Sequence, residues 1–125
     1  MAAVDELVER ARKGLARLTP QQAAAEQARG ALLVDTRTSE QRAQCGRIPG
    51  ALVIDRTVFE WRLDPTSTAR IPEVVDHATR VIVVCQEGYS SSLAAASLQA
   101  LGLVNATDMI GGFEAWRDAG MPVEP

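Results

Sequence analysis

Cys85 stands at a point in the chain where a thiol can act as a nucleophile. It follows four β-branched residues at 81–84 and precedes a glycine-containing segment at 86–89 and three serines at 90–92. This pattern predicts a strand, a turn and a helix, with Cys85 at the carboxyl end of the strand and below the start of the helix. The unpaired N–H groups of a helix N-terminus attract anions, so this position favours the thiolate, the nucleophilic form of cysteine.

The segments that must position Cys85 alternate between strands and helices. Apolar runs predict strands, and apolar side chains at helical spacing predict helices. Such alternation is typical of an α/β fold, with a mostly parallel sheet and helices on both faces. The expected strands are 31–34, 51–54, 81–84 and 107–110, with 17–18 as a short edge strand. The expected helices are 3–17, 19–28, 38–45, 71–78, 90–101 and one after 112, and 56–70 is expected to be irregular.

Composition excludes several classes of function. The chain has 125 residues, which suits one domain, and a net charge of −3 without a basic run, which argues against nucleic-acid binding. No apolar stretch is long enough to cross a membrane, and the charged start of the chain does not look like a secretory signal. Two cysteines and one histidine are too few for a zinc site, so we expect no metal and no cofactor. Free thiols suggest a reducing compartment, the cytoplasm.

Six short motifs occur in order along the chain. They are Thr19-Pro20, Leu-Val-Asp-Thr-Arg at 33–37, Gly-Arg-Ile-Pro-Gly-Ala at 46–51, Cys-Gln-Glu-Gly-Tyr-Ser-Ser at 85–91, Gly-Gly-Phe-Glu-Ala-Trp at 111–116 and Gly-Met-Pro-Val at 120–123. In this order they resemble the rhodanese family, the single-domain sulfurtransferases. The resemblance covers roughly residues 17–123, which makes 17–125 a rhodanese-like domain and 1–16 a helical extension.

The resemblance implies a three-layer fold around a five-stranded, mostly parallel sheet. It also implies that Cys85 carries a sulfane sulfur as a persulfide, which it accepts from thiosulfate or another persulfide. The acceptor would be cyanide, a thiol or a sulfur-relay protein, and the enzyme would be a monomer or a homodimer. The loop that wraps the sulfur, with N–H groups pointing inward, would be Gln86, Glu87, Gly88, Tyr89, Ser90 and Ser91. Near this loop, Asp35 and Arg37 are expected to form a structural ion pair, and Gly111-Gly112 to allow a tight turn.

The loop departs from the family pattern in its charge. Ser90 stands where many members have Arg or Lys, and Glu87 adds a negative charge. Both changes predict weak binding of thiosulfate. Arg56 and Arg62, after the second strand, are expected to restore positive charge at the pocket rim, and Trp61, with Phe59 and Tyr89, to form an apolar wall.

Two further residues and two alternative functions complete the interpretation of the sequence. Cys45 is expected to be a packed structural cysteine about 17–20 Å, one strand length, from Cys85, and His77 a solvent-facing helix residue. A phosphatase or arsenate reductase would need arginine six positions after the cysteine, where this chain has Ser91. A non-catalytic rhodanese-like module that binds or regulates a partner is the alternative to a sulfurtransferase.

Overall fold

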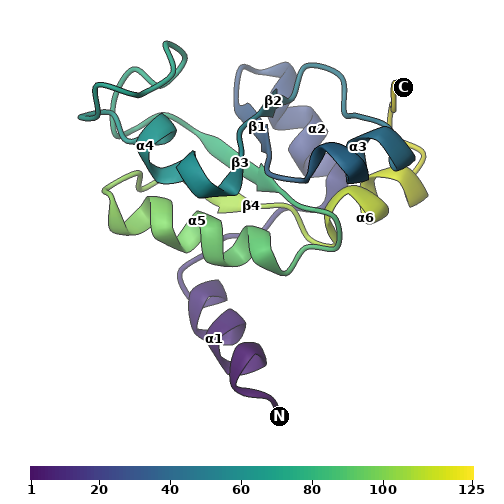
Figure 1. The fold of residues 1–125 in the computed structure, drawn as a ribbon, viewed down its shortest axis with the longest axis horizontal. Coiled ribbons are helices and arrows are strands. Elements are labelled where there is room, and N and C mark those ends of the chain that lie inside the picture. Colours follow the sequence, from purple (N-terminus) through teal and green to yellow (C-terminus); the bar gives the residue numbers. More distant parts are fainter.

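The computed structural model describes residues 1–125 and shows a parallel sheet with helices on both faces (Figure 1). This confirms the α/β class. The strands lie in the order β2–β1–β3–β4, and they are β1 (Leu32–Asp35), β2 (Leu52–Val53), β3 (Val81–Val84) and β4 (Thr107–Asp108). The helices are α1 (Ala3–Arg12), α2 (Pro20–Ala28), α3 (Ser39–Cys45), α4 (Phe59–Leu63), α5 (Ser90–Ala100) and α6 (Gly112–Asp118), with a short 3₁₀ helix, η1 (Arg56–Val58), before α4.

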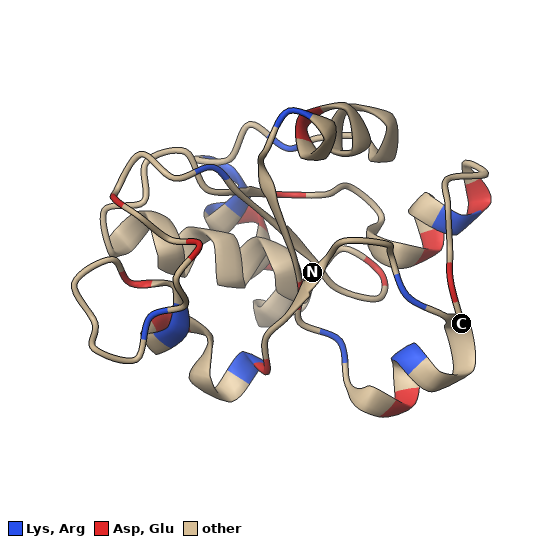
Figure 2. Ribbon diagram, turned by 90° about the horizontal axis from the view of Figure 1, so that it is seen from above, with Lys and Arg blue, Asp and Glu red and all other residues tan.

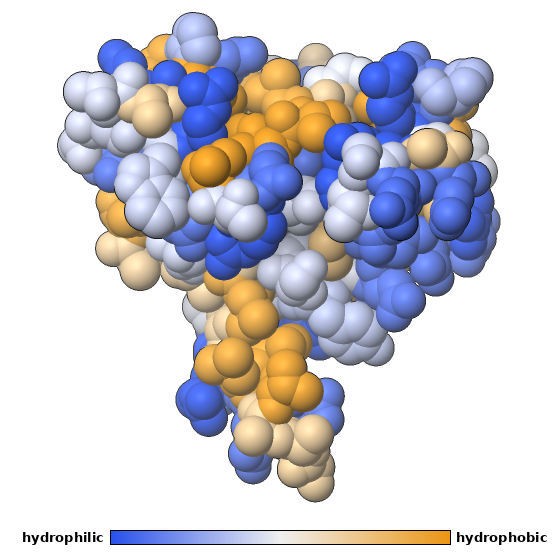
Figure 3. Space-filling view, in the orientation of Figure 1, coloured by the Kyte–Doolittle hydropathy of each residue, from blue (hydrophilic) through white to orange (hydrophobic).

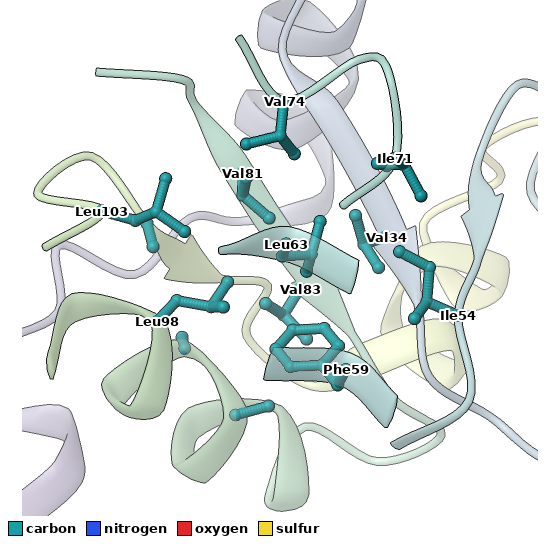
Figure 4. Packing of buried hydrophobic residues seen from close by; sticks show 13 residues of the cluster. Val34, Ile54, Phe59, Leu63, Ile71, Val74, Val81, Val83, Leu98 and Leu103 are labelled. Carbon is teal, nitrogen blue, oxygen red and sulfur yellow. The ribbon is translucent and has the colours of Figure 1, made fainter. Parts of the chain in front are cut away.

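The central strand β3 is completely buried and divides the core into two halves. Val81 and Val83 face one side, where they pack with side chains of α4 and α5 (Figure 4). Ile82 and Val84 face the other side, with side chains of α2 and α6. Burying each of these aliphatic side chains contributes about 1.5–3 kcal/mol, so β3 is firmly held and Cys85 follows it directly.

Two helices begin where the sequence provides a capping box. The Thr19 and Thr38 hydroxyls accept hydrogen bonds from the N–H groups of Gln22 and Gln41, and each glutamine side chain accepts from the N–H of its threonine. Pro20 occupies the first turn of α2, where a missing N–H costs nothing. These local signals explain why α2 and α3 begin where the sequence predicts.

The sheet has four strands, and the expectation of five is wrong. At the expected edge strand, Leu18 alone forms a parallel bridge, with Met109. Leu18 N donates to Asp108 O at 3.1 Å, and Leu18 O accepts from Ile110 N at 2.8 Å. The pairing stops there because Thr19-Pro20 turns the chain into α2, and proline has no N–H to donate.

Two predicted helices and one segment predicted to be irregular need correction. The first helix ends at Arg12 instead of residue 17. Residues 71–78 form turns because the Asp76 carboxylate and the Thr79 hydroxyl accept hydrogen bonds from nearby backbone N–H groups, in competition with a helix. Residues 56–63 are not irregular. They form η1 and α4, which are anchored in the core by Phe59 and Leu63 at helical spacing.

The surface is mixed in charge, and its exposed apolar residues include several on α1. Basic and acidic residues are interspersed along the ribbon (Figure 2). Helix α1 packs against α5 through the buried Val8 and projects from the body of the molecule (Figure 1). Met1, Val4 and Leu7 are exposed. Apolar atoms gather on the projecting helix (Figure 3). None of the helices combines the length and the apolar character that crossing a membrane requires.

Candidate active site

The Cys85 sulfur lies against two backbone N–H groups of its own loop. Gly88 N donates to Sγ at 3.1 Å, and Ser91 N donates at 3.3 Å. Ser91 is in the first turn of α5, so the second donor is one of the N–H groups that a helix leaves unpaired at its start. Only 6% of Cys85 is exposed. The arrangement favours negative charge on the sulfur in a site largely shielded from water.

The start of α6 holds the loop carbonyls on the opposite side. Phe113 N donates to Cys85 O at 2.8 Å, and Glu114 N donates to Gln86 O at 3.1 Å. No peptide bond in the chain is cis, and the O and H of a trans peptide point in opposite directions. The N–H groups of Gln86 and Glu87 therefore point away from α6. Neither forms a hydrogen bond within the protein.

Glycines allow the loop and the start of α6 to approach this closely. Gly88 has φ +89°, and a Cβ there would lie 2.6 Å from Gly111 N. Gly112 has φ +63°, and its Cβ would lie 2.5 Å from Cys85 O. Both backbones are in the left-handed region, which disfavours other residues. The tight turn expected at Gly111-Gly112 is thus confirmed.

A cavity of about 360 Å³ opens beside Cys85, within the range of roughly 300–1,000 Å³ typical of small-molecule sites. Its lining is mostly polar and uncharged, and Arg37 and Glu87 are its only charged residues. The lining residues are Thr36, Arg37, Thr38, Gln41, Cys85, Gln86, Glu87, Tyr89 and Ser90. Tyr89 therefore lies at the cavity as expected, whereas Thr38 and Gln41 were not among the candidate site residues that the sequence singled out.

The Arg37 guanidinium is committed to a structural role. Its Nη2 lies 2.9 Å from Asp35 Oδ2, and both side chains are almost completely buried, so the expected ion pair is present. The guanidinium also stacks over the Phe113 ring, 3.9 Å from its centroid, and donates to Gly46 O. Its charge is largely matched by Asp35, which leaves little attraction for an anionic substrate.

The prediction that Arg56, Trp61 and Arg62 line the Cys85 pocket is wrong. The cavity does not include them. Trp61 is 62% exposed and lies beside a separate hollow with Asp64 and Leu101. Arg62 donates to Ala69 O at 2.8 Å. The physical reason is that α4 turns Phe59 and Leu63 to the core and therefore Trp61 and Arg62 outward.

Phe59 and Arg56 are likewise occupied elsewhere. Phe59 is completely buried in the core, so it forms no wall of the pocket. Arg56 Nη1 pairs with Glu60 Oε1 at 2.9 Å. Burial raises the pKa of the Glu60 carboxyl, but hydrogen bonds from Ser97 and Arg56 outweigh it, and the pKa lies below its usual value of 4.5. Arg56 therefore belongs to a local ion pair and not to the Cys85 cavity.

Cys45 lies nearer the active loop than the predicted strand length. Gln86 Nε2, on the residue next to Cys85, contacts Cys45 Sγ at 3.7 Å, so the expected separation of 17–20 Å is wrong. Cys45 packs against the core beside α6, in agreement with a structural role, and both cysteines are free. His77 is exposed as expected, although in a turn and not in a helix.

The sequence did not single out three charged residues under the loop. Asp108 is completely buried in β4, and its carboxylate accepts hydrogen bonds from the hydroxyls of Ser91 and Ser92, both at 2.8 Å. Arg17 forms an ion pair with Asp108 at 2.9 Å. Arg12 and Arg17 both donate to Gly88 O. An acidic residue inside a buried strand was the available signal, because such a charge needs a partner.

The protein-family model of the rhodanese-like domain matches residues 19–119. The chain belongs to the rhodanese-like domain family. Among its relatives is the thiosulfate sulfurtransferase GlpE of Pseudomonas entomophila, which is 39% identical over 101 residues, covering 81% of this chain and 84% of the relative. The adenylyltransferase and sulfurtransferase UBA4 of Lodderomyces elongisporus is 31% identical over 93 residues, covering 74% of this chain and 20% of that protein.

A solved structure from Rhodopseudomonas palustris is similar to this protein over nearly its whole length. It has a TM-score of 0.87 and 31% identity, and the match covers 99% of this chain and 96% of that one, so it includes α1. That protein is described as being of unknown function and a possible tyrosine phosphatase. A rhodanese-related protein from Thermoplasma volcanium, at 21% identity and TM-score 0.67, shares the fold.

Proposed function

We propose that this protein is a rhodanese-type sulfurtransferase in which Cys85 carries the transferred sulfur as a persulfide. The observation that carries the proposal is the pair of N–H donors on Cys85 Sγ, from Gly88 and Ser91, at the base of an open polar cavity. The N–H groups of Gln86 and Glu87, which have no partner within the protein, are available to the additional anionic sulfur.

The transfer proceeds in two balanced steps. The Cys85 thiolate attacks the outer sulfur of the donor, a bond forms between the two sulfurs, and the donor's own S–S bond breaks. Its electron pair leaves on sulfite when the donor is thiosulfate, or on a thiolate when the donor is an organic persulfide. An acceptor nucleophile, a thiol or cyanide, then attacks the outer sulfur and regenerates the Cys85 thiolate. Because the thiol must start reduced, the proposal places the reaction in a reducing compartment, the cytoplasm.

We further propose that an organic persulfide is a better donor than thiosulfate. Thiosulfate is a dianion and needs a free cation, but residues 81–116 contain no arginine or lysine. The Arg37 guanidinium at the cavity is paired with Asp35, and Glu87 adds a negative charge. A persulfide on a small thiol or on a relay protein brings less negative charge to the same site.

Mass spectrometry of the intact protein tests the carrier step. Wild type, Cys85→Ser and Cys45→Ser are each incubated with glutathione persulfide or with thiosulfate. We expect wild type and Cys45→Ser to gain one sulfur atom, more from the persulfide, and Cys85→Ser to gain none. Equal gain by Cys85→Ser, or no gain with either donor, would overturn the sulfur-carrier function and favour the non-catalytic binding module.

The same preparation serves as a control for phosphatase activity. A cysteine phosphatase clamps its substrate with an arginine six positions after the nucleophile, and this chain has Ser91 there, with its N–H on Cys85 Sγ. We therefore expect no hydrolysis of p-nitrophenyl phosphate above the level of Cys85→Ser. Cys85-dependent hydrolysis would contradict the assignment of this loop to sulfur transfer.

A further inference from the structure

Two arginines hold one carbonyl of the active loop. Arg12 Nη2 donates to Gly88 O at 2.8 Å, and Arg17 Nη2 donates to the same oxygen at 3.0 Å. The peptide that carries this oxygen also carries the N–H of Tyr89, and in a trans peptide the two point in opposite directions. The arginines therefore direct the Tyr89 N–H away from themselves. That N–H has no partner within the protein.

The charge beneath the loop is positive. Arg17 is matched by the buried Asp108, whereas Arg12 donates its remaining hydrogen bond to the neutral hydroxyl of Ser92 at 3.0 Å. A cation hydrogen-bonded to a carbonyl polarises the peptide and makes its N–H a stronger donor. Arg12 is thus the unmatched cation of this network, and it contacts the loop without lining the cavity.

Arg12 comes from outside the part of the chain that the family model matches. It is the last residue of α1, whereas the family model begins at residue 19. Helix α1 is fixed to the domain by the buried Val8, and the Arg12 guanidinium lies 5.5 Å from the centroid of the Tyr89 ring. In Figure 1, α1 lies below α5, the helix whose first turn follows the loop.

We infer that Arg12 is a positioning residue, through which α1 clamps the active loop and aims the Tyr89 N–H at anionic sulfur on Cys85. In this way α1 supplies the positive charge that the loop itself lacks, because the loop has Ser90 in place of a cation and carries the negative Glu87. The effect on turnover rests on the proposed sulfur transfer, whereas the effect on the reactivity of the Cys85 thiol does not.

Alkylation of Cys85 by iodoacetamide, followed by mass spectrometry in a Cys45→Ser background, measures the clamp directly. We expect Arg12→Ala to slow alkylation at pH 6 by roughly three- to tenfold. The substitution removes a charged hydrogen bond that affects the thiol only indirectly, through the loop peptide. At pH 10, above the ordinary range for cysteine thiols, the two rates should converge. A loop that merely became more open would instead raise the rate at both pH values.

Two variants separate the clamp from general packing of α1. Arg12→Lys keeps the charge and one donor, so it should retain most of the pH 6 rate. Arg10→Ala removes an exposed arginine of the same helix and should leave the rate unchanged. Equal rates in Arg12→Ala and wild type, or an equal loss in Arg12→Lys and Arg12→Ala, would overturn the inference.

Steady-state sulfur transfer completes the test. Because Arg12 does not line the cavity, Arg12→Ala should lower kcat by the same three- to tenfold and leave the KM for the donor unchanged. If wild type transfers no sulfur but its alkylation depends on Arg12, the proposed function fails and the clamp stands. If sulfur is transferred but neither alkylation nor kcat depends on Arg12, the clamp alone fails.

Discussion

Replacing Asp108 with alanine tests how much the buried charge network contributes to folding. The completely buried carboxylate accepts four hydrogen bonds, two from the Arg17 guanidinium and one each from the hydroxyls of Ser91 and Ser92. The substitution removes the acceptor of all four. It leaves a mostly buried guanidinium and two buried hydroxyls without their partner.

The magnitude follows from this burial. Removing one partner of a buried ion pair costs about 3–5 kcal/mol. The Arg17 side chain keeps 16% of its surface exposed, so water reaches part of the guanidinium and the lower end of the range applies. We therefore expect Asp108→Ala to lower the free energy of unfolding by about 3 kcal/mol, which lowers the thermal midpoint by about 9–15 °C for a chain of this size.

Urea and thermal unfolding, followed by circular dichroism, measure this loss. The matched control is Asp118→Ala, because Asp118 pairs with Arg117 at the surface, where the two side chains are 72% and 47% exposed. We expect the control to cost about 0.5 kcal/mol or less. If the loss of unfolding free energy in Asp108→Ala is within about 1 kcal/mol of the loss in the control, the reasoning that burial makes this pair important is refuted.

Three further expectations concern single positions. Gly88→Ala should lower the free energy of unfolding by about 2 kcal/mol or more. Urea unfolding should show a smaller loss for Gly30→Ala, because both glycines have positive φ but only a Cβ at Gly88 meets another backbone atom. The hydrogen bond from Arg80 lowers the pKa of Glu26 from its usual 4.5. Glu26→Gln should therefore be less stable than wild type at pH 7 by about 0.5 kcal/mol. Unfolding at a series of pH values should show this difference in stability disappearing below pH 4.5 as the wild-type carboxyl protonates. A difference that persists at the lowest pH would contradict the role of the ion pair. Arg56→Ala should leave the rate of sulfur transfer unchanged within experimental error. A large loss of this rate would show that Arg56 does contribute to the active site.

Local sequence signals predicted the elements that hold Cys85. Four β-branched residues produced β3, and the threonine caps produced the starts of α2 and α3. Cys85 was singled out because the signals on both of its sides are short-range: a strand before it and a serine-rich helix start after it. Such patterns depend on propensity and hydrogen bonds within a few residues, which the sequence shows directly.

The pocket lining was less predictable. Arg56, Trp61 and Arg62 follow β2, at the correct edge of the sheet, but the direction of a side chain depends on how its helix packs. Phe59 and Leu63 bury one face of α4 and so turn Trp61 and Arg62 outward, while Arg56, in η1, pairs with Glu60. Topology alone places a segment at an edge and leaves open which of its side chains face the site.

The sequence by itself determined the α/β class and the family and singled out Cys85 as the candidate nucleophile, because each conclusion rests on motifs whose residues are close together in the chain. Tertiary structure decided what surrounds that nucleophile. Arg12 meets Gly88 across 76 positions, and Arg17 meets Asp108 across 91. Such pairings exist only once α1, α5 and β4 have packed together, because folding must first overcome the entropy of closing long loops and only then gains the contacts between their ends.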